Sequence, residues 1–405
     1  MPARVITAAA AAAVLAFSPV LDAQQPPARR GTAAFAAAVP SKVTVPVEYH
    51  KLDNGLKVVL SRDTSSPTAV VGIYYAIGFR IEPKDRTGFA HLFEHMMFQG
   101  SEHLGKNEFI SLVESNGGVL NGSTRFDFTN YFQIVPVHTL ETVLWAEADR
   151  MWGLKITQDN LTNQQGVVKN EVKVNVLNQP YGGFPWLDLP QHANTNWYNA
   201  HNFYGELADL DASTLADVQQ FFKTYYAPNN AALVVSGDID TKQTLEWVRK
   251  YFGGIPASKL APQPDISEPR QEKERRASRE DPLANRPAVA VGYHAPLRDT
   301  PEYYAMGLID QLLVQGADSR LYQSLVQKRG LTGEVDGGIN LLGNMFDVKG
   351  PTLFTVYVIH DADKKADDII AAVDQEITRL QNAPVTKEEL ELAVVKRRSR
   401  LYADY

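Results

Sequence analysis

The stretch His91-Leu92-Phe93-Glu94-His95 is the most informative part of this 405-residue chain. On a helix with 3.6 residues per turn, His91 and His95 lie about 40° apart around the axis, and Glu94 lies about 60° to the other side of His91. One helix face therefore carries two imidazoles and a carboxylate. Two neutral imidazoles at this spacing can bind one Zn²⁺, and a carboxylate that is not a ligand can take a proton from the water on the metal. The glutamate directly precedes the second histidine, the inverse of the HExxH order.

The residues around the motif predict a buried helix, because Ala90, Met96, Met97 and Phe98 are apolar. Buried imidazoles and a buried carboxylate cost free energy unless they have partners. A metal would satisfy all three groups at once. We therefore favour a metal site over ordinary core or surface histidines.

A catalytic zinc needs a third protein ligand and an open position. On chemistry alone, several acidic residues on expected helices could supply that ligand: Glu114, Glu141, Glu147, Asp149 and Glu171. The residue pattern does not choose among them.

Composition excludes several classes of protein. The net charge of −7 at pH 7 gives no reason to expect nucleic acid or an anionic membrane as a partner. The chain has no cysteine, which excludes disulfides, thiol catalysis and thiolate zinc sites. Beyond the N-terminus no stretch has the length and hydropathy of a membrane span.

The N-terminus has the layout of a secretory signal. Arg4 precedes an apolar region from Val5 to Phe17, and Ala23 is a small residue suited to cleavage. We expect a signal peptide at 1–23, a flexible leader at 24–43, and export, most simply to a bacterial periplasm. The alternative is an alanine-rich disordered tail.

The rest of the chain predicts two α+β domains, each a largely antiparallel sheet packed with helices. We place the first at 44–253 and the second at 288–405, with a proline-rich and charged linker at 254–287. The second domain repeats the course of the first at an offset of 216 residues, which places Gly307, Asp310 and Gln311 where the first has His91, Glu94 and His95. The repeat should therefore lack the metal site. It also looks incomplete, since the chain stops inside an expected helix.

Four further segments carry a resemblance to a known family. They are Asn170-Glu171, GGVLNGSTRFDFTNYF (117–132), YYAPNNAALVVSGDID (225–240) and GADSRLYQSLVQKRGL (316–331). Together with the motif, they resemble the M16 zinc metallopeptidases, which include insulin-degrading enzyme, pitrilysin and the mitochondrial processing peptidase. The resemblance covers nearly everything from about residue 47 onward.

This resemblance implies a metalloendopeptidase with one Zn²⁺ per chain, held by His91, His95 and Glu171. Glu94 is then the general base that activates the zinc-bound water. Gln164 stands where relatives commonly have a glutamate, and its amide is expected to help orient the ligands.

The resemblance also implies where a peptide would bind. Asn121, Gly122 and Ser123 correspond to the family's edge strand, on which an extended peptide or an unfolded polypeptide lies as an added strand. Gly122 departs from the family pattern, because alanine is usual there.

One departure concerns the second half. Active relatives use an arginine and a tyrosine seven residues apart, whereas this chain has Val326 and Gly333 at those positions. We therefore expect a homologous M16 subunit, in a heterodimer or a homodimer, to supply the missing pair. The alternative function is a non-catalytic structural or assembly subunit of an M16-type complex. Relatives of that kind usually lose the histidines or the base, which this chain keeps.

Overall fold

The computed structural model describes residues 44–404. The expected signal peptide and leader lie outside the described residues. Within 44–404, no helix combines the length and the hydropathy that a bilayer crossing requires.

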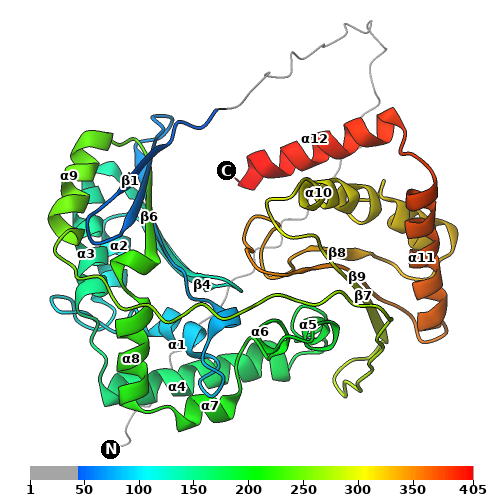
Figure 1. Ribbon diagram of the computed structural model, residues 1–405, viewed down its shortest axis with the longest axis horizontal. Helices are drawn as coiled ribbons and strands as arrows, with labels where there is room; N and C mark the ends of the chain where they lie inside the picture. The colour runs from blue at the N-terminus through cyan, green and yellow to red at the C-terminus, as the bar shows by residue number, and fades with distance from the viewer. Residues whose placement is uncertain (1–43, 405) are drawn as a thin grey trace, which may run out of the picture. The chain divides into compact units, whose positions relative to one another are not determined.

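The first half contains a six-stranded sheet in the order β1-β2-β6-β3-β5-β4 (Figure 1). Its strands are β1 (Glu48–Lys51), β2 (Lys57–Arg62), β3 (Thr68–Tyr75), β4 (Val119–Thr124), β5 (Thr129–Pro136) and β6 (Ala231–Gly237). All neighbouring pairs are antiparallel except β2 and β6. The longer helices of this half are α1 (Phe89–Met96), α2 (Glu108–Ser115), α3 (Leu140–Trp152), α4 (Gln158–Val172), α8 (Leu215–Tyr225) and α9 (Thr241–Phe252).

The second half contains a three-stranded antiparallel sheet in the order β7-β9-β8. Its elements are β7 (Ala288–His294), α10 (Pro301–Leu313), the π-helix η5 (Tyr322–Lys328), β8 (Asp336–Ile339), β9 (Leu353–Ile359), α11 (Ala366–Asn382) and α12 (Lys387–Asp404). The capping box expected before the last helix is confirmed, since Thr386 N donates to Glu389 Oε2 (2.9 Å) and Glu389 N donates to Thr386 Oγ1 (3.1 Å). The α+β fold of mixed helices and antiparallel sheets is as predicted.

Three strands of the first sheet and the three strands of the second sheet share an order. In the first sheet β5 lies between β3 and β4, and in the second sheet β9 lies between β7 and β8. A Cβ on Gly122 of β4 would lie 3.1 Å from Glu94 Cγ, and a Cβ on Gly338 of β8 would lie 3.5 Å from Asp310 Oδ1. The offset of 216 thus relates both the glycines and the acids.

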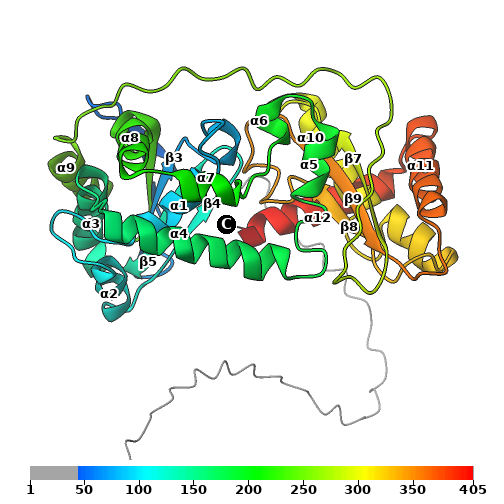
Figure 2. The same ribbon diagram turned by 90° about the horizontal axis from the view of Figure 1, so that it is seen from below.

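Helix α1 is held between the first sheet and α4, and Figure 2 shows α4 beside it. Phe89, Leu92, Phe93 and Met96 of α1 are fully or almost fully buried. The segment has no β-branched residue, which favours a helix. Gly100 lies just beyond it with φ of 108°, a left-handed conformation that glycine adopts without strain. Packing and turn chemistry together fix the position of the motif.

Several elements were not expected from the sequence. They are the strand β1, the short helices α5 (Asp188–Ala193), α6 (Trp197–Ala200) and α7 (Leu207–Ala212), and the 3₁₀-helices η1 (Phe79–Ile81) and η4 (Pro228–Asn230). The 3₁₀-helix η2 (Val137–Thr139) lies at the start of the helix expected from His138. The helix expected from about 160 to 177 consists of α4 followed by a π-helix, η3 (Lys173–Leu177). Residues 256–287 have no helix or strand, but they are not simply solvated, because Asn196 Nδ2 donates to Asp265 O and to Ser267 O (2.8 and 2.9 Å).

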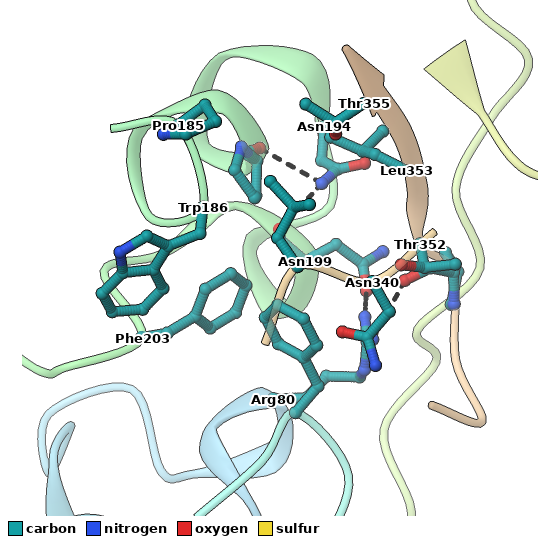
Figure 3. Close-up of a pocket in the computed structure, with 14 residues that line it drawn as sticks. Arg80, Pro185, Trp186, Asn194, Asn199, Phe203, Asn340, Thr352, Leu353 and Thr355 are labelled. Carbon is teal, nitrogen blue, oxygen red and sulfur yellow. Dashed lines mark hydrogen bonds between the residues drawn. The ribbon is translucent and has the colours of Figure 1, made fainter. Parts of the chain in front are cut away.

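Arg80 connects segments from both halves of the chain. Its side chain is 2% exposed, and Nε donates to Asp127 Oδ1 (2.6 Å). Nη1 donates to Asn199 Oδ1 and Nη2 donates to Pro351 O (2.9 Å), and Figure 3 shows Arg80 beside Asn199. The other Asp127 oxygen accepts from Lys349 N (2.6 Å). The cavity beside Arg80 has a volume of only about 30 Å³, room for one or two water molecules, so it does not accommodate a peptide.

Candidate metal centre and peptide site

The structure brings His91, His95 and Glu171 together. His91 Nε2 lies 3.5 Å from Glu171 Oε1, and His95 Nε2 lies 3.1 Å from Glu171 Oε2. One ligand atom from each residue lies within 4.8 Å of the other two. Helix α1 supplies both imidazoles and α4 supplies the carboxylate, so two segments about seventy-six residues apart in sequence meet at one point.

The donor set fits a divalent cation of the zinc type. Two imidazole nitrogens and one carboxylate oxygen are the ligands of many catalytic zinc sites, and zinc bonds of about 2.0–2.1 Å put tetrahedral ligand atoms about 3.3 Å apart. The distances of 3.5 Å from His91 Nε2 to Oε1 and of 3.1 Å from His95 Nε2 to Oε2 are of this size, although each histidine lies nearest to a different oxygen of Glu171. Hydrogen bonds from His91 and His95 hold the pKa of Glu171 well below its usual range, which keeps the carboxylate charged as a ligand must be.

The competing acids have other partners or lie in solvent. Glu147 is buried and its Oε1 accepts from Gln133 Nε2 (2.6 Å) and from Arg150. Asp149 Oδ1 lies 2.5 Å from His103 Nδ1, and Glu141 Oε1 accepts from Lys250 Nζ (3.1 Å). Glu114 is exposed on α2. None of them belongs to the histidine cluster, so the geometry selects Glu171.

Glu94 is held by a residue that the sequence analysis missed. Thr124 Oγ1 on β4 donates to Glu94 Oε2 at 2.5 Å, and Thr124 is 6% exposed. Glu94 Oε1 has no hydrogen bond to any residue in the described part of the chain, so it can accept one from water or substrate. Thr124 and Gly122 lie two residues apart and so point to the same face of β4. This two-residue period of a strand was the feature of the sequence from which Thr124 could have been predicted to face the same side as Gly122.

A second missed residue supports the start of α1. Glu82 is fully buried and accepts hydrogen bonds from Gly88 N (2.9 Å) and Ala90 N (2.5 Å). A carboxylate at the start of a helix accepts hydrogen bonds from N–H groups that have no partner within the helix, and its negative charge interacts favourably with the positive end of the helix dipole. Burial raises the pKa of Glu82 to about 8, while these two N–H groups oppose the rise because they bind the charged form.

Tyr204 packs on His91. Its ring lies 5.2 Å from the His91 ring in an edge-on arrangement, and the two histidine rings lie 5.0 Å apart. Burial, and then the charges of Glu171 and Glu94, raise the pKa of Tyr204. Next to it, a Cβ on Gly205 would lie 2.3 Å from Gly88 N, so only glycine permits this approach to the start of α1. Tyr204 thus helps to fix the position of His91.

Gln164 is placed differently from the prediction. Gln164 is buried, but its Nε2 donates to Asn163 Oδ1 (2.8 Å), and no hydrogen bond joins it to His91, His95 or Glu171 among residues 44–404. The expected orienting contact is therefore not seen.

Asn121, Gly122 and Ser123 lie on β4, which is the edge strand of its sheet as predicted. Asn121 Oδ1 accepts from Gly122 N (2.8 Å), and Ser123 Oγ donates to Asn130 Oδ1 (2.6 Å). The other edge of β4 is available for a further strand.

Arg320 and Arg329, which lie near Val326 and Gly333 in the sequence, form hydrogen bonds with other residues of the second half. Arg320 donates to Glu389 Oε1 (2.9 and 3.1 Å), and Arg329 donates to Gln375 Oε1 (2.5 Å). Val326 belongs to η5, and Gly333 precedes β8. Neither arginine replaces the missing arginine and tyrosine.

Comparison with known proteins agrees with this picture. Residues 57–181 match the sequence model "Insulinase (Peptidase family M16)", and residues 212–395 match "Peptidase M16 inactive domain". The chain belongs to the M16 peptidase family.

The sequence identity between this chain and individual members of the family is low. The chain is 27% identical to "Zinc protease PqqE" of Helicobacter pylori over 84% of its own length and 76% of that protein. It is 26% identical to "Cytochrome b-c1 complex subunit 1, mitochondrial" of Homo sapiens over 57% of its length, which spans only 47% of that subunit. A crystal structure of a protease from Helicobacter pylori superposes with a TM-score of 0.83 at 26% identity, covering 89% of this chain and 86% of that one.

Proposed function

We propose that this chain is an exported, zinc-dependent metalloendopeptidase that hydrolyses peptide bonds in peptides or unfolded segments. The observation that carries the proposal is the convergence of His91, His95 and Glu171, with Glu94 on the same helix. The similarity to a protein named as a zinc protease supports the same class of activity.

The chain's own residues would perform the following steps. A Zn²⁺ bound there would act as a Lewis acid toward water and the scissile carbonyl. Glu94, with Oε2 fixed by Thr124, would accept the proton of the attacking water on Oε1. It would then pass that proton to the leaving amine nitrogen. The free edge of β4 would hold the substrate as an added strand.

Glu94→Gln tests this assignment. Since Glu94 is not in the ligand cluster, the variant should keep the zinc content of the wild type and lose at least about a hundredfold in kcat. Metal analysis and cleavage of a quenched fluorescent peptide library provide the two readouts. Wild-type turnover in this variant would exclude Glu94 as the base.

A homologous partner subunit is part of the proposal. Val326 and Gly333 cannot donate side-chain hydrogen bonds, and Arg320 and Arg329 are engaged. The partner would therefore provide donors for the developing oxyanion. Purification alone and together with the product of a neighbouring M16 gene tests this idea. Equal peptidase activity in both samples would exclude it.

Export is proposed from residues 1–23. N-terminal sequencing of the protein from a periplasmic fraction should give Gln24 as the first residue. An intact Met1 in the mature protein would contradict it.

The second candidate function is a non-catalytic subunit, suggested by the similarity to the cytochrome b-c1 subunit. The complete set of two histidines, base and carboxylate favours the enzyme. A zinc-loaded protein that, alone and with its partner, cleaves no peptide of a diverse library would favour the second candidate.

A further inference from the structure

The turn between β4 and β5 packs on the second half of the chain. Phe126 in this turn is 7% exposed and belongs to the same hydrophobic cluster as Tyr303 of α10 and Phe354 of β9. Its ring meets the ring of Phe203 edge-on, with the ring centroids 4.6 Å apart. The strand that follows differs, since Tyr131 of β5 is buried in the cluster around the first sheet. The β4–β5 hairpin therefore reaches from one hydrophobic cluster to the other.

Asp127, the next residue of the turn, binds backbone groups of the second half. Its Oδ2 accepts hydrogen bonds from Lys349 N (2.6 Å) and Gly350 N (3.1 Å), in the loop between β8 and β9. Its Oδ1 accepts a hydrogen bond from Arg80 Nε (2.6 Å). In strand order, β8 and β9 are the counterparts of β4 and β5. Equivalent connections of the two sheets thus meet at this carboxylate.

Arg80 holds the turn through its main chain and its side chain. Arg80 N donates to Phe126 O (2.9 Å), next to the bond between Arg80 Nε and Asp127. The two remaining guanidinium nitrogens donate to Asn199 Oδ1 and to Pro351 O. A buried guanidinium with an acceptor on each nitrogen has one orientation, because its planar fork matches all three acceptors at once. The second half is therefore joined to the turn by a rigid contact.

Gly350 permits the close approach of the β8–β9 loop to Arg80. A Cβ at this position would lie 2.7 Å from Arg80 Nε and 2.8 Å from Arg80 Cζ. The three acceptors keep Arg80 from moving aside. A larger residue at position 350 would therefore push the loop away from the turn.

The turn follows directly on the residue that holds the proposed base. Thr124, at the end of β4, donates to Glu94 Oε2 (2.5 Å), and two residues separate Thr124 from Asp127. Arg125 N donates to Phe128 O (2.8 Å), which closes the turn. Strand β4 pairs with β5 alone, because it is an edge strand. The position of Thr124 therefore depends on where the turn is held.

We propose that Asp127 and Arg80 are positioning residues through which the second half holds Thr124, and thereby Glu94, in place. This inference rests on the proposed peptidase function and adds a role for the half that lacks the histidine motif. That half supplies two N–H groups to Asp127 and one carbonyl to Arg80, and this contribution does not require the missing arginine and tyrosine. A misplacement of about 1 Å caused far from the chemistry can lower a rate by about a hundredfold.

A double-mutant cycle on kcat tests the inference. Asp127→Asn keeps the size of the side chain, but its amide has one donor group in place of an oxygen and cannot accept from both Arg80 and the β8–β9 loop. The variant should keep the zinc content of the wild type and lower kcat by about tenfold or more. In a Thr124→Val background the same change should lower kcat by less than about threefold, because the hydroxyl through which it acts is absent. The same factor in both backgrounds overturns the inference, since a merely structural role gives additive effects.

Gly350→Ala tests the contact from the second half. Its Cβ would meet Arg80, so kcat should fall as it does in Asp127→Asn. This variant also serves if Asp127→Asn fails to fold. Gly254→Ala is the matched control, because a Cβ at Gly254 would have no atom within 4 Å, and it should leave kcat within about twofold. Wild-type kcat in folded Gly350→Ala overturns the role of the second half.

Hydrogen–deuterium exchange separates this inference from the proposed peptidase function, because it needs no substrate. In folded Asp127→Asn, the amides of residues 119–128 should exchange about threefold faster or more, whereas those of α9 should exchange as in the wild type. Faster exchange confined to the hairpin, in a protein that cleaves nothing, supports the inference while the peptidase function fails. Unchanged exchange in the hairpin overturns the inference, even if the wild type cleaves peptides.

Discussion

Thr124 Oγ1 donates a 2.5 Å hydrogen bond to Glu94 Oε2, and this contact links the edge strand β4 to the motif helix α1. It leaves Oε1 as the oxygen available for proton transfer. The strand that would hold the peptide and the base that would serve it are therefore positioned together.

Removing this hydroxyl should lower kcat more than it changes KM. Thr124→Val keeps the shape of the side chain but loses a hydrogen bond to a charged group, worth about 1.5–3 kcal/mol, so kcat should fall by about ten- to a hundredfold. Thr124→Ser keeps the donor and should recover most of the activity. Steady-state kinetics at wild-type zinc content provide the measurement. A valine variant with wild-type kcat would show that Thr124 does not position the base.

Glu171→Ala should remove most of the bound metal. In the proposed site the carboxylate is the one ligand from α4, so its loss should lower zinc affinity by more than the about 10–100-fold seen when an outer partner of a ligand is removed. Competition with a zinc-binding dye measures this affinity. Glu114→Ala, which alters an exposed acid on α2, is the control and should bind zinc as the wild type does.

Glu82→Ala should destabilise α1. Two buried N–H groups, of Gly88 and Ala90, would lose their acceptors, which costs about 2–4 kcal/mol of the free energy of unfolding. Urea denaturation measures the change, with Glu206→Ala as the control because Glu206 is exposed. Equal stability of both variants would show that water replaces the carboxylate at the helix end.

The buried carboxyl group of Asp310 should make the free energy of unfolding depend on pH. Burial raises its pKa from about 3.8 to about 6. The pKa of Asp310 is higher in the folded state than in the unfolded state, so protonated Asp310 contributes to the stability of the fold. This contribution is fully present below pH 3.8 and is lost as the pH rises through about 6. Asp310→Asn does not titrate. Its unfolding free energy, relative to the wild type, should rise between pH 4 and pH 7.5 by on the order of 2 kcal/mol. A pH-independent difference would contradict this account.

The sequence predicted the motif helix and its neighbours well, because apolar burial and helix spacing act locally. Glu171 followed from family resemblance, since four other acids were chemically equivalent until tertiary structure gave three of them partners and left Glu114 in solvent. Thr124 was missed although it shares a face of β4 with Gly122, because the sequence alone does not show that this face meets α1. Glu82 was missed because it lies in a loop, where no local period reports a contact with α1.

In the second half, too, the sequence did not predict contacts between distant segments. The sequence predicted a repeat from glycine pairs and an offset, but it did not predict that α5, from the segment between α4 and α8, covers β7. The polar network of Arg80 likewise joins residues 80, 127, 199 and 351, whose proximity only the folded chain reveals.

The most direct test is the anomalous difference map of a crystal grown with zinc, measured at the zinc absorption edge. The account predicts one strong peak about 2.0–2.1 Å from nitrogens of His91 and His95 and from an oxygen of Glu171. A map with no peak at these three side chains, or with Glu171 turned away from an ion on the histidines, would contradict it.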